Sequence, residues 1–523
     1  MEAISLDASE RSEVVSAERS DKHSYREILK SSAWVGGSTV LNIAVGMVRT
    51  KATAALLGPA GFGLNGLYSS VSELAISIAG MGVNSSGVRQ IAEAAGAADQ
   101  ECIARTAFAL RRVSVVLGLL GAALLIVFSQ QISALTFGTP RRAPAICVLS
   151  VVVLFKSISN GQAALIQGLR RISDLAKMNV LAAVFGTIFS IPLIYFFREQ
   201  GIIPALIGVA GMTILTSWHY SRKYQIQTPR MRGIEVWRQV VPLLKLGAAF
   251  MVSGLMMMGS AYAVRIIVLR QLGFEATGLY QCAWTLGGLY VGFILQAMGA
   301  DFYPRLTACA RDNVACNRLV NEQARVGLLL AGAGVTATLT FAPLVIWLFY
   351  NSKFAGAADV LRWICLGATL QVVTWPMGYI VLAKGKQNIF FWSELAWTAV
   401  YVSLAWICVK WFGVVGAGVA FFVAYLFHGV LIYPIVRHLS GFRWSAENVR
   451  TGLFSLALIA IVFSSFYLLP LIASICVGAL CSGLSAFYSL RVFLELTPAE
   501  RIPPRLRHWM GRIGLRQLNH DEH

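Results

Sequence analysis

Apolar runs of about 17–25 residues recur along almost the whole chain, and an α-helix needs this length to cross a bilayer. The composition agrees with membrane insertion. Of the 523 residues, 57% are hydrophobic and 13% are charged, whereas soluble domains have about 45–50% apolar and 25% charged residues. We therefore predict an all-α polytopic membrane protein with about fourteen transmembrane helices.

The apolar runs define the predicted spans and the segments between them. The spans are expected at 33–57, 62–83, 113–130, 144–165, 178–197, 201–220, 246–272, 277–301, 326–350, 357–382, 389–410, 414–436, 452–469 and 471–492. An even number of spans places both termini on the same side of the membrane. The polar segment 1–30 and the basic segment 494–523 are then tails on that side, and the N-terminal tail is expected to be irregular up to about Tyr25.

Lysine and arginine are divided unevenly between the two sides that this topology creates. If the N-terminus is cytoplasmic, 33 of the 44 cations lie on cytoplasmic segments. The outer loops hold only Arg141, Arg142, Arg198, Lys353, Arg362 and Lys410. This excess follows the positive-inside rule and explains the net charge of +19 as topology. The basic loops are accordingly expected to face anionic lipid, and we predict no nucleic-acid partner.

A short pattern occurs twice, 215 residues apart. LGPAGFGL begins at Leu57, after the first span, and LGFEATGL begins at Leu272, after the seventh. Each follows a helix with two cations and precedes a helix that ends in Met-Gly. We interpret this as a duplication that produces an N-lobe (31–232) and a C-lobe (233–445), each with six spans, around a central cavity. The last two spans, within 446–493, lie outside the repeat.

Five cations fall inside the predicted spans, where a charge is costly and usually functional. They are Arg49, Lys51, Lys156, Arg265 and Arg270. Arg49 and Lys51 lie about 200° apart around a helix, so they cannot share one face. We expect Arg49 to line a cavity and Lys51 to extend to the outer surface. Arg265 is likewise expected inside, with Arg270 as an interfacial anchor.

Three further titratable residues lie in or near the spans. Glu73 and Lys156 are each about twelve residues into their spans from the same side, so they are a plausible ion pair. Such a pair either joins helices or takes part in substrate or ion movement. Glu394 is expected to be solvated at a helix end, and His428 to be a packed polar residue.

Motifs for enzymatic chemistry are missing from the sequence. It contains no Walker A motif, H-E-x-x-H, G-x-S-x-G or acidic D-x-D pair, and no loop is long enough for a catalytic domain. The nine cysteines form no C-x-x-C pair, so neither a metal site nor a disulfide framework is expected. We predict a protein without a cofactor that is not an enzyme.

The segment from Ser31 to about Ala94 resembles the N-terminal region of O-antigen translocases. These are lipid-linked oligosaccharide flippases of the multidrug/oligosaccharidyl-lipid/polysaccharide exporter (MOP) superfamily. The similar elements are the cationic first helix, the turn LGPAGFGL and the helix end GMGVNSSGVRQIAE. Strong similarity covers about the first hundred residues, and the rest agrees in the order of spans. Many of these proteins are drawn with twelve spans, so the extra pair departs from the pattern.

The resemblance implies a bacterial inner-membrane protein that moves an undecaprenyl-diphosphate-linked glycan to the periplasmic leaflet without ATP hydrolysis. The glycan could be O-antigen of lipopolysaccharide, enterobacterial common antigen or an exopolysaccharide unit. Membrane lipid and other polysaccharide-assembly proteins are the expected partners. In related flippases with fourteen spans the last two form a groove for the lipid tail, and 452–492 could do the same.

The resemblance and the buried cations together suggest a binding site for the diphosphate. Arg49, Lys156 and Arg265 are the best candidates to hold it, with Lys51 and Arg270 at the outer end. Glu73 would pair with a cation when the site is empty. The alternatives are a drug/cation antiporter of the same superfamily, a membrane glycan polymerase or acyltransferase, and a scaffold. An antiporter is expected to have acidic cavity residues, and a polymerase a large outer loop.

Overall fold

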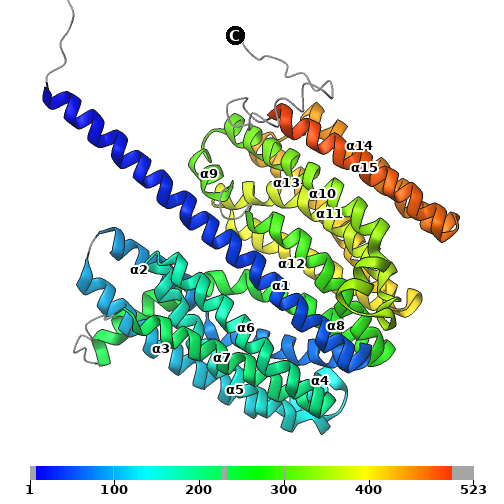
Figure 1. Cartoon of the computed structure of the whole chain (residues 1–523), viewed down its shortest axis with the longest axis horizontal. Coiled ribbons are helices and arrows are strands. Elements are labelled where there is room, and N and C mark those ends of the chain that lie inside the picture. Colours follow the sequence, from blue (N-terminus) through cyan, green and yellow to red (C-terminus); the bar gives the residue numbers. More distant parts are fainter. Residues whose placement is uncertain (1–7, 98, 225–232, 298–301, 497–523) are drawn as a thin grey trace, which may run out of the picture. The chain divides into compact units, whose positions relative to one another are not determined.

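The computed structural model describes residues 8–97, 99–224, 233–297 and 302–496, and its regular elements there are all helices (Figure 1). Within these residues, eleven helical segments are long and apolar enough to cross a membrane. Three of them each overlap two of the predicted spans: Gly37–Gly80, Ile172–Arg222 and Gly254–Leu289. The predicted all-α polytopic membrane fold is confirmed.

The chain divides into two compact units. Unit 1 comprises 1–57 and 68–258, and unit 2 comprises 58–67 and 259–523. Two long helices contribute to both units, because unit 2 includes 58–67 of α1 (Ala8–Gly80) and the part of α8 (Gly233–Ala297) from 259 onward.

Unit 1 is a bundle of long helices joined by short connections (Figure 1). Besides its parts of α1 and α8 it contains α2 (Val83–Gly96), α3 (Gln100–Val127), α4 (Ser129–Phe137), η1 (Pro140–Arg142), α5 (Ala143–Gly168), α6 (Ile172–Phe197), η2 (Arg198–Gly201) and α7 (Ile202–Arg222). Helix α5 is central, since it packs against α2, α3 and α7. Glycine allows α3 and α5 to approach closely: a Cβ at Gly161 would lie 2.2 Å from the Oγ of Ser114.

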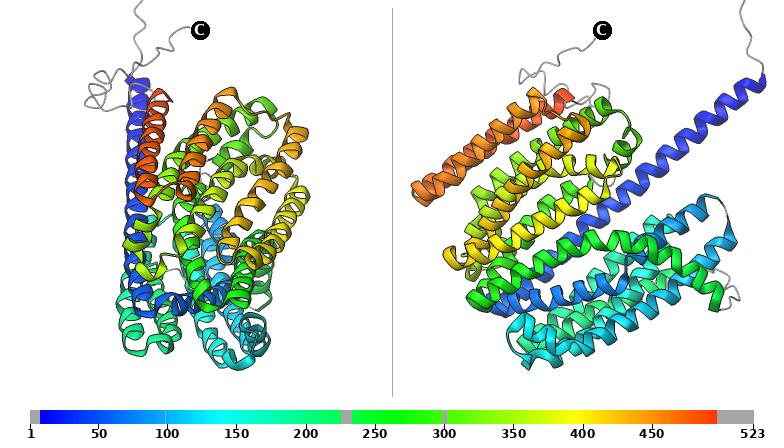
Figure 2. Two further views of the ribbon diagram at one scale, coloured as in Figure 1. Left: turned by 90° about the vertical axis from the view of Figure 1, so that its right-hand side faces the viewer. Right: turned by 180° about the vertical axis from the view of Figure 1, so that it is seen from behind.

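Unit 2 continues with a second set of long helices. After its part of α8 come α9 (Tyr303–Ala308), α10 (Asn313–Phe349), η4 (Ser352–Phe354), α11 (Ala357–Ala383), α12 (Gln387–Phe412), α13 (Val415–Ser440), α14 (Ala446–Leu468) and α15 (Leu471–Leu496). Helix α11 is the most buried of these spans and packs against α10 and α13. Helices α14 and α15 run side by side and both contact α10 (Figure 2).

The predicted repeat has the same backbone conformation in both copies. Gly58 has φ 66° and ψ −175°, and Gly273 has φ 88° and ψ −174°. This region is accessible almost only to glycine. The repeated pattern is therefore a one-residue break at which two helices meet, within α1 in the first copy and within α8 in the second. In the first copy Pro59 follows the break, a position where proline is well tolerated because it begins the next helical turn.

A second glycine of each repeat brings the two copies into contact within unit 2. A Cβ added to Gly278 would lie 1.9 Å from the carbonyl oxygen of Pro59, and one added to Gly63 would lie 2.5 Å from that of Phe274. The segment 58–67 therefore packs backbone to backbone against the start of the second half of α8. Only glycine at these two positions allows this approach.

The prediction of an irregular N-terminal tail is wrong, because α1 is helical from Ala8. The reason lies in the composition of the first thirty residues. They contain no glycine and no proline and are rich in alanine, glutamate, arginine and lysine, which are favourable helix formers. Polarity removed the apolar signal of a span, but it did not remove helix propensity.

Candidate functional site

Arg265 on α8 is a buried cation of unit 2. It is 9% exposed, and its Nε donates a hydrogen bond of 2.6 Å to Oε1 of Gln281. Gln281 in turn donates from Nε2 to Oγ1 of Thr285, at 3.2 Å. The guanidinium carbon lies 6.0 Å from the ring centroid of Trp284. These contacts fix the arginine through one edge of its guanidinium.

The glutamine that holds Arg265 is positioned by the contact between the repeats. A Cβ at Gly66 would lie 2.9 Å from the same Oε1, so glycine there leaves room for the amide. Two buried tyrosines, Tyr280 and Tyr401, interact electrostatically with Arg265, and their hydroxyl oxygens are 3.2 Å apart. The arginine is thus surrounded by neutral polar and aromatic groups.

No carboxylate neutralises Arg265 within the part of the chain that the structure describes. The ion pairs among described residues involve other cations, such as Arg362 with Asp359 at 2.7 Å. A buried charge without a counter-ion is costly and is normally retained only where it has a function. Arg270, five residues further along α8, is exposed.

The predicted cations of unit 1 lie on two helices. Arg49 on α1 and Lys156 on α5 are both half-buried, and Lys156 is within electrostatic range of Arg49 and Glu73. Lys51 and Glu73 are exposed. Of the predicted residues, the structure therefore brings together Arg49, Lys156 and Glu73 in unit 1, while Arg265 and Arg270 belong to unit 2.

A cavity of about 230 Å³ lies within unit 1. Its polar lining residues are Ser77, Asn84, Ser85, Ser114, Ser157 and Asn160. The remaining lining residues are apolar or glycine: Ile76, Gly80, Gly82, Val83, Leu117, Gly161, Met251 and Gly254. They come from α1, α2, α3, α5 and α8 and the junction between α1 and α2. No lining residue carries an ionisable side chain.

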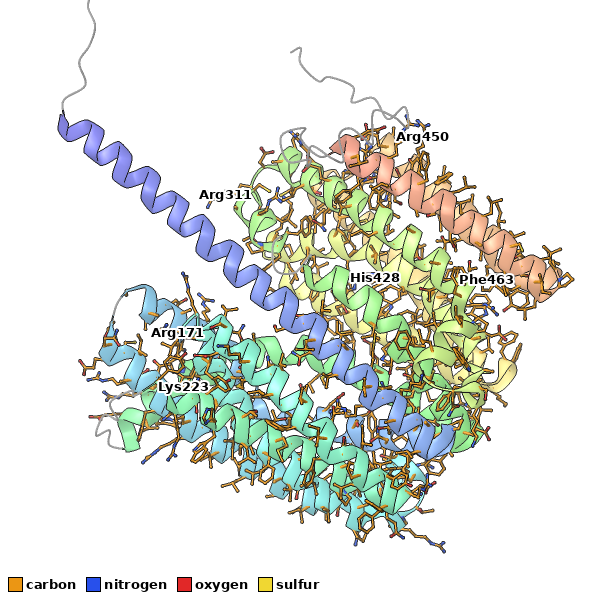
Figure 3. The ribbon with its side chains drawn as sticks, viewed as in Figure 1. Arg171, Lys223, Arg311, His428, Arg450 and Phe463 are labelled. Carbon is orange, nitrogen blue, oxygen red and sulfur yellow. The ribbon has the colours of Figure 1, made fainter. Side chains whose placement is uncertain are left out.

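Glu394 and His428 form a pair in unit 2 that the sequence analysis did not anticipate. His428 is labelled in Figure 3. Oε1 of Glu394 on α12 lies 3.9 Å from Nε2 of His428 on α13. The side chain of Glu394 is 28% exposed, so it is half-buried and not fully solvated at a helix end. The sequence places the two residues 34 positions apart, and no pattern links them.

Sequence reasoning also missed the residues that surround the cations. Gln281 and Trp284 are an ordinary amide and an aromatic residue within an apolar run. The six polar residues of the cavity are serines and asparagines, which are common in membrane helices. One signal could have drawn attention to Gln281, because it lies three residues after the second glycine of the repeat.

Comparisons with known proteins agree with this architecture. A family model described as "Polysaccharide biosynthesis protein" matches residues 53–359. The Lipid III flippase of Escherichia coli K12 is 24% identical over 423 residues, which cover 76% of this chain and 95% of that protein. The Lipid III flippase of Shigella flexneri matches to the same extent.

Two solved structures share the fold. The Lipid II flippase MurJ in an inward closed conformation aligns with a TM-score of 0.65 and 14% identity, over 88% of this chain and 99% of MurJ. An inward-facing multidrug resistance MATE transporter of the MOP superfamily aligns with a TM-score of 0.62 and 18% identity, over 77% and 95% of the two chains. The resemblance to MOP-superfamily flippases is confirmed. The family model covers more than half of this chain, so the chain belongs to the polysaccharide biosynthesis protein family.

Proposed function

We propose that the protein is a flippase for a lipid-linked glycan in the bacterial inner membrane. The relatives named as flippases and the MOP transporters of the same fold agree with the predicted transporter class and not with an enzyme. In finer detail, the substrate is an undecaprenyl-diphosphate-linked oligosaccharide that moves from the cytoplasmic to the periplasmic leaflet by alternating access. The oligosaccharide is a repeat unit of O-antigen, of common antigen or of an exopolysaccharide. Both termini of the protein lie on the cytoplasmic side.

Arg265 is the observation that carries this proposal. A diphosphate carries several negative charges and cannot cross hydrocarbon unaided. A buried guanidinium whose Nε is already bound still offers its terminal nitrogens, and guanidinium binds phosphate oxygens through paired hydrogen bonds. The aromatic and amide groups around Arg265 are neutral, so they do not neutralise its positive charge. The charge is therefore available to a bound anion.

The cations of unit 1 have a supporting role in the proposal. Arg49 and Lys156 hold the same diphosphate at another stage of the cycle, and Glu73 attracts one of them when no anion is bound. Lys51 and Arg270 contact it at the outer end. The lipid tail of the substrate lies along α14 and α15, which pack against each other and against α10.

Reconstitution tests the function directly. We expect the purified protein in liposomes to transfer a fluorescent undecaprenyl-diphosphate-linked sugar between leaflets without ATP. Transfer is scored by quenching from outside, with protein-free liposomes as the control. Failure to move this lipid, combined with export of a cationic dye, would favour a drug antiporter instead.

Two cations on one helix give a matched pair of variants. Arg49→Gln is expected to lower transfer by about tenfold or more, because a charged hydrogen-bond donor to the diphosphate is lost. Lys51→Gln is expected to have an effect of less than about threefold, because Lys51 is exposed and an exposed charge is well screened. Transfer by the same liposome assay, normalised to inserted protein, measures both. Equal losses in the two variants would contradict the assignment of Arg49.

A further inference from the structure

We infer that the cavity of unit 1 is a binding site for an uncharged sugar of the glycan. The inference rests on the proposed function and adds a second recognition element to it. The first support is the lining, which combines four serine hydroxyls, two asparagine amides and no ionisable side chain. Hydroxyl and amide groups match the donors and acceptors of a sugar, whereas the diphosphate requires cations.

The second support is that these polar groups are not used by the protein itself. Within the part of the chain that the structure describes, none of the six side chains forms a hydrogen bond with another residue: Ser77, Asn84, Ser85, Ser114, Ser157 and Asn160. Serine in a membrane helix usually donates its hydroxyl to a carbonyl of the preceding turn, as Ser72 does to Tyr68. Because these six side chains form no hydrogen bonds with one another, their donors and acceptors are available to a polar ligand.

Among the six side chains, Ser157 gives the strongest evidence for a ligand. It is 6% exposed, and its Oγ is buried without a hydrogen-bond partner. A buried hydroxyl without a hydrogen-bond partner destabilises the folded protein unless a ligand supplies that partner. A serine hydroxyl on a cavity wall reaches a ligand by rotation about one bond. The ligand therefore provides the partner that the chain does not.

The start of α2 adds backbone donors to the same wall. The helix begins at Val83, directly after Met81 and Gly82, which both have positive φ, and its N-cap Gly82 has no side chain to cap it. The first N–H groups of a helix have no partner within it, and here Val83, Asn84 and Ser85 all line the cavity. A Cβ at Gly82 would lie 2.0 Å from the carbonyl oxygen of Gly247, so α8 holds this junction in place.

Two lipids that differ only in the sugar test the inference. The probes are undecaprenyl diphosphate and undecaprenyl diphosphate that carries one N-acetylglucosamine, whose hydroxyl and acetamido groups offer both donors and acceptors. Binding of each to the purified protein in nanodiscs is measured by titration. We expect the wild type to bind the sugar-bearing lipid about tenfold more tightly, as a few additional hydrogen bonds would give.

Variants locate this preference in the cavity. Ser157→Ala and Asn160→Ala are each expected to weaken binding of the sugar-bearing lipid about three- to tenfold and to leave binding of undecaprenyl diphosphate unchanged. Gly254→Trp should remove the preference, since a Cβ there meets nothing within 4 Å and the ring can fill the cavity. Gly254→Ala is the matched control, because it adds one methyl group and favours the helix.

A thermal melt without lipid separates binding from folding. Ser157→Ala should melt at or above the wild-type temperature, since it removes an unsatisfied group. The inference alone is overturned if the wild type binds both lipids equally and the cavity variants behave like the wild type. A wild type that binds neither lipid overturns the proposed function as well.

Discussion

Arg265→Met is expected to slow lipid transfer severely while the folded protein is as stable as the wild type or more stable. The two effects have opposite signs because Arg265 is buried without a carboxylate among the described residues. Replacing an uncompensated buried charge by an apolar side chain of similar length removes a desolvation cost. Loss of the proposed contact between Arg265 and the diphosphate should lower the transfer rate about 10- to 100-fold. Leaflet transfer and thermal unfolding of the same purified sample measure the two effects.

Arg362→Met is the matched control, because Arg362 is a buried arginine with a structural role. It is 7% exposed, pairs with Asp359 at 2.7 Å and lies 3.8 Å over the ring of Phe466. Its replacement should lower the melting temperature and leave transfer per folded molecule near the wild-type value. Arg265 would lose its assigned role if Arg265→Met transferred lipid normally, or if it lost stability in the way that Arg362→Met does.

Arg265→Lys separates charge from geometry. Lysine keeps the positive charge, but it has no Nε–H that can donate to Gln281 and only a point charge for the phosphates. We expect transfer between that of the wild type and that of Arg265→Met. A wild-type rate would mean that charge alone is sufficient at this position.

The sequence predicted the membrane fold well because its signals are long and redundant. Each span is a run of about twenty apolar residues, and the distribution of lysine and arginine provides an independent test of topology. The repeat was also visible, since glycine at positions 58 and 273 marks a backbone conformation that few other residues adopt. The prediction failed in the polar segment from Ala8 onward, which was expected to be irregular because it has no apolar run, although its residues favour a helix.

The surroundings of the cations could not be predicted, because they depend on contacts between distant segments. Gln281 contacts Arg265 across the break at Gly273, and Gly66, more than two hundred residues earlier, leaves room for its amide. Glu394 and His428 meet across α12 and α13. The polar residues of the cavity come from four helices, and each is unremarkable in its own sequence context. One-dimensional patterns reveal which residues are costly to bury, but not which groups share their environment.

Gly278→Val is expected to prevent accumulation of folded protein. A Cβ at this position would lie 1.9 Å from the carbonyl oxygen and 2.6 Å from the carbonyl carbon of Pro59. Both atoms belong to the backbone of a segment that is fixed by the neighbouring break at Gly58, so no side-chain rotation relieves the clash. Overpacking against flexible side chains costs about 1–3 kcal/mol, and a rigid backbone neighbour should raise this to about 3 kcal/mol or more. Fluorescence-detected size-exclusion chromatography of detergent extracts measures the yield.

Gly259→Ala on the same helix is the control for the general effect of replacing glycine. A Cβ there meets nothing within 4 Å, and alanine favours a helix over glycine by about 0.5–1 kcal/mol. This variant should therefore accumulate at the wild-type level or above. A monodisperse Gly278→Val protein with a wild-type melting temperature would show that the two repeats need not touch at Pro59. In that case the contact between the two repeats is not needed to keep Gly66 beside Gln281. The position of Arg265 would then depend on α8 alone.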